Sequence, residues 1–399
     1  MILICGAGIT GLSIARELLN KGFCDITIIE KEKTLGKHAS GRNSGVLHAG
    51  IYYTPDSLKA QCCLKGNRLM KQYCKEKGLT LIESGKVIVT KKESELSTLE
   101  ELYRRAKLNG ALVEIIDEKA LKEIEPYAKT CKKALFSPET AIINPDEILN
   151  SLEAELSDRG VKILKGVTLN GVKGSRIAVT DRGKIEFVKF INASGAHADR
   201  IAHKFGLAFN YRIIPFKGLY KKLTKEKANL VRGNIYPVPD IRNPFLGIHF
   251  TKIHDSTVYV GPTATPAFGR ENYGIFDDIG FETLKILYRD FSLFISNEKF
   301  RNTAFTEIRK YFKKKFYEDV KDMIEGVGIE DLLPSNKAGI RPQLIDVNKK
   351  ELVMDFLVIK DSNTIHILNA ISPAFTSAFA FAEFIIKEYF MEKNNGKLV

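Results

Sequence analysis

The sequence has few cysteines, and their spacing is not that of a disulfide scaffold or a metal site. Six cysteines occur among 399 residues, all in the first third of the chain, with no CxxC pair and no HExxH motif. Small secreted domains that depend on disulfides carry a denser set. No basic segment followed by a leader-type apolar run opens the chain. We therefore expect a protein of the reducing cytoplasm with unpaired thiols and no metal centre.

Long uninterrupted hydrophobic runs are missing as well. The most apolar stretch, Ile365 to Ile386, contains Asn369, Ser372, Pro373 and Glu383. A membrane-spanning helix needs about 20 predominantly apolar residues without such interruptions. The stretch instead predicts a strand, a turn at the proline and a buried helix.

Basic residues outnumber acidic ones in a chain that is otherwise of globular composition. The 61 Lys and Arg against 48 Asp and Glu give a formal net charge of +13, and 44% of the residues are hydrophobic. This composition excludes a disordered chain, and the length suggests two or three domain-sized units. The basic runs Lys221 to Lys227 and Arg309 to Lys315 are interpreted as solvated faces of amphipathic elements. An anionic membrane surface is the alternative partner, and nucleic acid is not expected.

The first 30 residues predict a strand, a glycine turn, a helix and a second strand. Met1 to Cys5 is apolar, and the turn Gly6-Ala7-Gly8-Ile9-Thr10-Gly11 follows it directly. Its glycines allow the backbone to approach a pyrophosphate at the helix N-terminus. Glu30 ends the second strand, where a carboxylate accepts the ribose hydroxyls of an adenosine. The unit predicts an ADP-containing dinucleotide without distinguishing FAD from NAD.

The rest of the chain alternates strand-like and helix-like segments without an internal repeat. Strands that extend the N-terminal unit are expected after Val161 and again after Ala338. We predict an α/β fold in which a discontinuous Rossmann-type domain comprises residues 1–78, 145–210 and 335–399. Residues 79–144 and 211–334 are expected to form a second α+β domain with a mixed sheet that holds the substrate.

Four motifs in order along the chain resemble those of FAD-dependent oxidoreductases of the D-amino-acid oxidase and glycerol-3-phosphate dehydrogenase type. They are Ser40 to Gly50, Asn192 to Ala196, Gly339 to Pro342 and Ser372 to Ala374. The resemblance implies that FAD is the cofactor. It implies these cofactor-binding residues: Gly6, Gly8, Ile9, Thr10, Gly11, Glu30, Lys31, Arg42, Asn43, Ser44, Gly45, Val46, Leu47, Val167, Ser194, Gly195, Pro373, Ala374, Phe375 and Thr376.

Further motifs look like those of the L-2-hydroxyglutarate dehydrogenases, also called oxidases. They are Arg42 to Tyr53, Ser57 to Ala60, Gly66-Asn67, Pro215 to Gly218, Ile235 to Pro239, Phe245 to Thr251, Val260 to Pro262 and Arg270 to Tyr273. The chain departs from the family at Thr263, Asn272 and Phe375. The resemblance implies oxidation of L-2-hydroxyglutarate to 2-oxoglutarate, with electrons passed to a quinone or another acceptor. The alternatives are an amino-acid or glycerol-3-phosphate oxidoreductase of the same fold, or a non-catalytic flavoprotein that binds RNA or a partner.

Oxidation of a 2-hydroxy acid needs a hydride acceptor, a base for the hydroxyl proton and a cation for the carboxylate. Flavin supplies the first. Arg341, in a predicted Gly-Ile-Arg-Pro turn, is the candidate carboxylate ligand because a guanidinium binds bidentately. His48 and His249 are the two candidates for the base. For a second substrate carboxylate the candidates are Lys217, Arg270 and Tyr273. We expect the protein in the cytoplasm, with the inner face of the membrane as a candidate docking surface.

Overall fold

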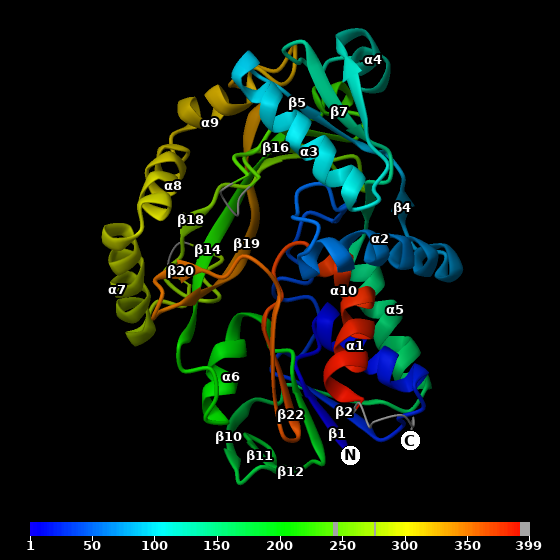
Figure 1. Ribbon diagram of the computed structural model, residues 1–399, viewed down its shortest axis with the longest axis vertical. Helices are drawn as coiled ribbons and strands as arrows, with labels where there is room; N and C mark the ends of the chain where they lie inside the picture. Colours follow the sequence, from blue (N-terminus) through cyan, green and yellow to red (C-terminus); the bar gives the residue numbers. More distant parts are fainter. Residues whose placement is uncertain (242–245, 275–276, 392–399) are drawn as a thin grey trace.

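The computed structural model describes residues 1–241, 246–274 and 277–391. Phe245 of the motif Phe245 to Thr251, and residues 392–399 of the predicted third segment of the Rossmann-type domain, lie outside the described residues. Two large sheets dominate the fold (Figure 1). Among the residues that the structure describes, no helix combines the length and the apolarity that crossing a bilayer requires.

The first sheet has six strands drawn from three separate stretches of the chain. Their order is β21 (Leu357–Asp361), β22 (Thr364–Asn369), β13 (Lys189–Asn192), β1 (Ile2–Cys5), β2 (Ile26–Glu30) and β9 (Lys162–Lys165). All neighbours are parallel except β21, which is antiparallel to β22. Strands β1 and β22 are buried along their whole length, as expected for strands covered on both faces. The predicted α/β fold with a Rossmann-type sheet is confirmed.

Helices cover both faces of this sheet. On one side lie α1 (Ile9–Asn20), α5 (Pro145–Asp158), α10 (Ala374–Ile385) and α2 (Leu58–Lys77), which form one group of helices on the right of Figure 1. On the other side lie α6 (Ala198–Lys204) and a small sheet of β10 (Leu169–Lys173), β11 (Ile177–Thr180) and β12 (Gly183–Glu186). The stretch Ile365 to Ile386 thus forms β22, a turn and α10, as predicted.

Local sequence signals set the ends of these helices. The hydroxyl of Ser57 accepts a hydrogen bond from the backbone N–H of Ala60 at the start of α2. The same helix ends at Gly78, whose φ of 64° is the left-handed conformation that glycine adopts without strain. At the start of α5, Asn144 caps the helix and Pro145 occupies the first turn.

The second sheet has ten strands. Its order is β20 (Glu351–Leu352), β19 (Leu332–Asp346), β14 (Tyr211–Leu223), β17 (Val258–Gly261), β16 (His249–Lys252), β15 (Asn234–Pro237), β5 (Lys86–Val89), β7 (Lys133–Ser137) and β6 (Glu114–Asp117), with β18 (Thr265–Pro266) beside β14. Strands β15 and β5 are parallel and the other neighbours antiparallel, so the sheet is mixed.

Shorter elements surround this sheet. They are β3 (Val46–Leu47), β8 (Ala141–Ile143) and β4 (Leu81–Ile82), which form a three-stranded sheet, the helices α3 (Leu96–Leu108), α4 (Glu118–Ile124), α7 (Phe281–Ser296), α8 (Glu298–Arg309) and α9 (Lys313–Val320), and the short helical turns η1 (Glu93–Glu95), η2 (Gly195–His197), η3 (Ala228–Leu230) and η4 (Ile386–Phe390). Helices α7, α8 and α9 follow one another along one edge of the molecule (Figure 1).

The long strand β19 corrects two predictions. It pairs with β14 from Tyr211 opposite Asp346 to Leu223 opposite Leu332. The predicted boundary at residue 335 therefore falls inside a strand of the ten-stranded sheet. The Gly-Ile-Arg-Pro segment is extended strand rather than a turn. Pro342 lies opposite Pro215, so the two missing backbone donors fall at the same rung of the ladder.

Candidate active site

A cavity of about 1290 Å³ runs between the two sheets. Its walls include Cys5, Glu30 and Ala193, at or just after the carboxyl ends of β1, β2 and β13. Ligands of open α/β sheets bind at this edge. From there the cavity continues to His48 and Arg341.

The glycine turn forms one end of the cavity and has no room for larger side chains. Gly6 has a φ of 108°, and a Cβ there would lie 2.5 Å from the carbonyl oxygen of Ala193. A Cβ on Gly11 would lie 2.0 Å from the carbonyl oxygen of Gly6. Helix α1 follows with Gly8 as its N-cap, and the backbone N–H of Ile9 donates to the hydroxyl of Ser40 at 3.0 Å. The positive end of α1 faces the cavity, which Gly8, Ile9 and Thr10 line, and this is where a pyrophosphate is stabilised.

Glu30 stands beside this turn. Its Oε2 accepts the backbone N–H of Ala7 and its Oε1 accepts that of Glu32, both at 2.9 Å. Each carboxylate oxygen has a second lone pair, so the side chain can hold the turn and still accept ribose hydroxyls. The chemistry of the turn and of Glu30 fits an ADP-containing dinucleotide such as FAD.

The loop after β2 continues the wall toward α10. Asn43 holds this loop, because its Oδ1 accepts the N–H of Gly45 and its Nδ2 donates to the carbonyl of Ser40. Thr376, in the first turn of α10, accepts the N–H of His48 at 3.1 Å through its hydroxyl. The predicted cofactor residues that line the cavity are Gly6, Gly8, Ile9, Thr10, Glu30, Lys31, Arg42, Asn43, Ser44, Val46, Val167, Ser194, Gly195, Pro373, Ala374, Phe375 and Thr376.

Three predicted cofactor residues do not line the cavity. Gly11 packs α1 on the turn, as its lack of space for a Cβ shows. Gly45 has a φ of 72° and lies against the carbonyl of Ile143. Leu47 is buried in the hydrophobic core beside the sheet, so its predicted contact with the cofactor is corrected. Val46 faces the cavity and Leu47 faces away because neighbouring strand residues point to opposite sides.

The far end of the cavity brings together His48, His249 and Arg341. His249 stacks on Tyr236 with ring centroids 3.8 Å apart, and its Nδ1 lies 3.2 Å from the hydroxyl of Thr251. His48 Nδ1 has no hydrogen-bond partner among the described residues. Sequence reasoning therefore selected residues that do share one site.

Both imidazoles are neutral at pH 7. Burial, and then the charge of Lys86, lower the pKa of His48 to about 3. Burial lowers the pKa of His249 well below its ordinary value, with smaller contributions from His48 and Lys86. A neutral imidazole has a free lone pair, so each ring is in the form that accepts a proton.

Arg341 stays charged in this environment. Burial lowers its pKa to about 10, and the nearby Tyr53 opposes that shift. A pKa of about 10 leaves the guanidinium protonated at neutral pH. The cation predicted to hold the substrate carboxylate is therefore present in the cavity.

Two buried lysines were missed by sequence reasoning. Lys59 lines the cavity and donates a hydrogen bond to the carbonyl of Met354. Burial, and then the charge of Arg341, lower its pKa to about 7. The only sequence feature that pointed to Lys59 was its place in the motif Ser57 to Ala60. A motif does not show whether the side chain points into the cavity.

The second missed lysine, Lys86, lies behind the cavity wall. It is 1% exposed, and its ammonium lies 4.6 Å from the ring centroid of Tyr52 and 5.0 Å from that of Tyr236. Its Nζ has no hydrogen-bond partner among the described residues. Burial lowers its pKa to about 7. The two tyrosines thus separate this cation from the cavity by an aromatic layer.

Of the candidates for the second substrate carboxylate, Lys217 lies outside the cavity wall, whereas Arg270 lines the cavity with a guanidinium that is already paired. Lys217 does not line the cavity, although Phe216 and Gly218 on either side of it do. Its ammonium donates to the carbonyl of Gly274 at 2.6 Å. Arg270 is 2% exposed and pairs with Asp199 and Glu282. Its contacts are those of a structural ion pair.

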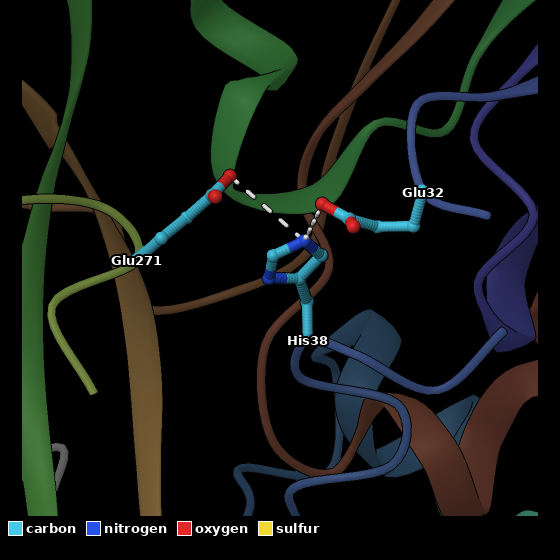
Figure 2. A group of neighbouring side chains, drawn as sticks. All are labelled: Glu32, His38 and Glu271. Carbon is cyan, nitrogen blue, oxygen red and sulfur yellow. Dashed lines mark hydrogen bonds and ion pairs between the residues drawn. The ribbon is translucent and has the colours of Figure 1, made fainter. Parts of the chain in front are cut away.

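Tyr273 lines the cavity and contacts the loop after β2. Its hydroxyl lies 2.9 Å from Nδ1 of His38, and the guanidinium of Arg42 lies 4.0 Å from its ring centroid. Figure 2 shows the adjoining group, in which His38 contacts Glu32 and Glu271. The ammonium of Lys31 also contacts both carboxylates, at 2.5 and 2.8 Å. The hydrogen bond with His197, followed by that from Lys31, lowers the pKa of Glu271 to about 2.

This group contains the donor types that bind divalent cations, but the ammonium of Lys31 already lies between its two carboxylates. The group links the loop after β2 to the segment after β18, on opposite sides of the cavity. We interpret it as an ion network that joins the two parts of the molecule.

Comparison with known proteins gives consistent results. Residues 1–387 match the family described as FAD dependent oxidoreductase. The mitochondrial L-2-hydroxyglutarate dehydrogenase of Homo sapiens is 34% identical over 409 residues, covering 97% of this chain and 88% of that protein. The L-2-hydroxyglutarate dehydrogenase of Escherichia coli strain K12 is 34% identical over 391 residues, covering 96% and 92%.

Solved structures share the fold at lower identity. The FAD-bound L-alpha-glycerophosphate oxidase of Mycoplasma pneumoniae has a TM-score of 0.76 at 22% identity, covering 97% of this chain and 93% of that chain. Glycine oxidase of Geobacillus kaustophilus has a TM-score of 0.71 at 18% identity, covering 99% and 95%. These similarities concern the fold alone.

Proposed function

The chain belongs to the L-2-hydroxyglutarate dehydrogenase family within the FAD-dependent oxidoreductases, and we propose that it oxidises L-2-hydroxyglutarate to 2-oxoglutarate. FAD, when bound, accepts the hydride from C2 of the substrate. The glycine turn, Glu30 and the first turn of α10 are the groups that hold this cofactor.

The observation that carries the proposal is the positive charge gathered at one end of the cavity. Arg341 and Lys59 line that end, and Lys86 lies behind it. Asp355 is close to Lys59, but its oxygens accept the backbone N–H groups of Leu58, Lys59 and Phe356. A substrate with two carboxylates complements this charge. The α-ammonium group of an amino acid does not, which argues against the amino-acid alternative.

The residues at this end of the cavity can bind the two substrate carboxylates and accept the hydroxyl proton. Arg341 is placed to bind the C1 carboxylate with its planar fork, which fixes the direction of C2. Lys59 keeps two ammonium hydrogens beyond the one donated to Met354, and these can bind the distal carboxylate. His48 or His249 accepts the hydroxyl proton, since both rings are neutral and buried.

We further propose a quinone as the electron acceptor. Helix α8 supports this, because Glu307 lines the cavity while Phe305 and Ile308 of the same helix are exposed apolar side chains. A quinone analogue is expected to give faster turnover than oxygen in steady-state assays. Faster turnover with oxygen contradicts the proposal and indicates an oxidase.

Anaerobic mixing of the yellow holoenzyme with L-2-hydroxyglutarate tests the main proposal. Loss of flavin absorbance and formation of 2-oxoglutarate in equal amounts are expected, with no reaction of the D enantiomer at the same concentration. Rapid loss of absorbance with glycerol 3-phosphate or an amino acid, and none with L-2-hydroxyglutarate, contradicts it.

A further inference from the structure

Helix α7 has apolar side chains on two opposite faces. Thr283, Ile286 and Leu293 are buried against the fold. On the other side Phe281, Leu284, Tyr288, Phe291 and Ile295 repeat at intervals of three and four residues and are all exposed, Phe281 at 94%. Such spacing places side chains on one face of a helix. The solvent side of α7 is therefore a continuous apolar stripe.

Exposed apolar side chains also occur in the next segment. Phe305 and Ile308 of α8, and Phe312 directly before α9, are also exposed. Helices α7, α8 and α9 lie along one outer edge of the molecule (Figure 1), and we refer to the exposed apolar side chains of residues 281–312 as the α7–α8 face. Many exposed apolar side chains gathered along one edge of a fold indicate an interaction site.

Basic residues accompany the α7–α8 face. Residues 281–315 contain nine Lys or Arg and four Asp or Glu. Three of those acids are neutralised or buried: Glu282 pairs with Arg270, Glu307 pairs with Lys310, and the carboxylate of Asp290 is buried. Lys285, Arg309, Lys313 and Lys314 are exposed. The surroundings of the apolar stripe are thus positively charged.

We propose that the α7–α8 face docks on an anionic lipid bilayer, with its apolar side chains in the interface and its basic residues on lipid headgroups. Exposed aromatic and aliphatic side chains with a basic border are what such an interface accommodates. A second copy of the chain fits less well, because a two-fold interface sets each patch against itself and brings the same basic border together. The docking site lies beside the cavity, since Glu307 of α8 lines it.

Vesicle binding by the holoenzyme tests the proposal. We expect sedimentation with vesicles of phosphatidylglycerol and phosphatidylcholine, weaker binding to phosphatidylcholine alone, and weakening as salt rises. The double variant F281S/F291S and the double variant K313E/K314E should each bind at least ~10-fold more weakly. The matched controls are L108S/L112S and K119E/K184E, which change exposed residues elsewhere and should bind like the parent.

A single fluorescent probe locates the contact. The chain contains no tryptophan, so F281W and L108W each introduce one indole. Vesicles whose acyl chains are brominated should quench the emission of F281W and leave that of L108W unchanged. Flavin reduction by L-2-hydroxyglutarate with a soluble dye as acceptor should be the same in every variant, which separates this proposal from the proposed substrate.

Three results overturn the proposal. One is absence of vesicle binding by the parent at low salt. Another is equal binding by F281S/F291S and the parent. The third is concentration-dependent self-association of the parent that F281S/F291S abolishes without any vesicle binding, which assigns the face to a second copy of the chain.

Discussion

Lys59 should determine the preference for a substrate with two carboxylates. In Lys59→Met the side chain keeps its approximate length and loses the ammonium, while Arg341 remains in place. A hydrogen bond to a charged group contributes about 1.5–3 kcal/mol, which corresponds to a factor of about 10 to 150 in rate or binding. We therefore expect kcat/KM for L-2-hydroxyglutarate to fall by about 10- to 150-fold.

The matched substrate is L-2-hydroxypentanoate, which has the same carbon chain but lacks the distal carboxylate. Its kcat/KM should change little in Lys59→Met, because it offers nothing for the ammonium to bind. Lys65→Met on the exposed side of the same helix is the control variant. An equal loss for both substrates, or an unchanged ratio between them, refutes the assignment of Lys59.

The same lysine predicts a pH dependence. Its pKa is lowered by burial and by Arg341 to about 7, and the protonated form binds the carboxylate. The kcat/KM for the dicarboxylate should therefore fall as pH rises through about 7. This decrease of kcat/KM with rising pH should be absent with L-2-hydroxypentanoate as substrate, and it should be absent in Lys59→Met. Lys86 has a similar pKa, but it remains in the variant and cannot produce the difference.

Four further outcomes are expected. Arg341→Lys keeps the charge and loses the fork, so kcat/KM should fall at least ~10-fold; unchanged kinetics remove Arg341 from the site. One of His48→Ala and His249→Ala should retain FAD and slow flavin reduction by about 10² to 10⁴, whereas parental rates in both place the base elsewhere. Glu30→Ala should raise the Kd for FAD in a titration of the apoprotein, and equal affinity excludes its role in binding the ribose. Arg270→Met should lower the free energy of unfolding by about 3–5 kcal/mol in urea denaturation, because it leaves Asp199 buried without its partner; parental stability contradicts the structural role.

The nucleotide-binding half of the fold was predictable because its signals are local. The glycine turn, the helix after it and the strand ending at Glu30 are contiguous, and each needs only near neighbours to form. The position of Arg341 was predicted from a motif, but its conformation was not. The glycine and the proline in that segment indicated a turn, whereas pairing along the whole of β14 keeps it extended.

The error at Lys217 has a different cause. Alternating polarity identifies the buried face of a strand only when the other face is in water. Residues Ile213 to Lys217 of β14 are all buried. The segment therefore lacks the alternation of polar and apolar residues that would show which side chains face the cavity. Arg270 does line the cavity, but its ion pair with Asp199 could not be predicted, because Asp199 is 71 residues away in the sequence. The roles of Lys59 and Lys86 likewise depend on contacts between distant segments. The expected cytoplasmic location stays a prediction.

The charges around the cavity connect substrate binding to proton transfer. Without substrate, burial and then the charge of Lys86 hold the pKa of His48 at about 3, so its ring is a weak base. A dicarboxylate bound by Arg341 and Lys59 brings two negative charges into the same buried end. Opposite charge nearby favours the protonated form of an imidazole, so the two substrate carboxylates act to raise the pKa of His48 and of His249. The base is therefore strengthened by the ligand from which it takes the proton, and a monocarboxylate, with half the charge, strengthens it less.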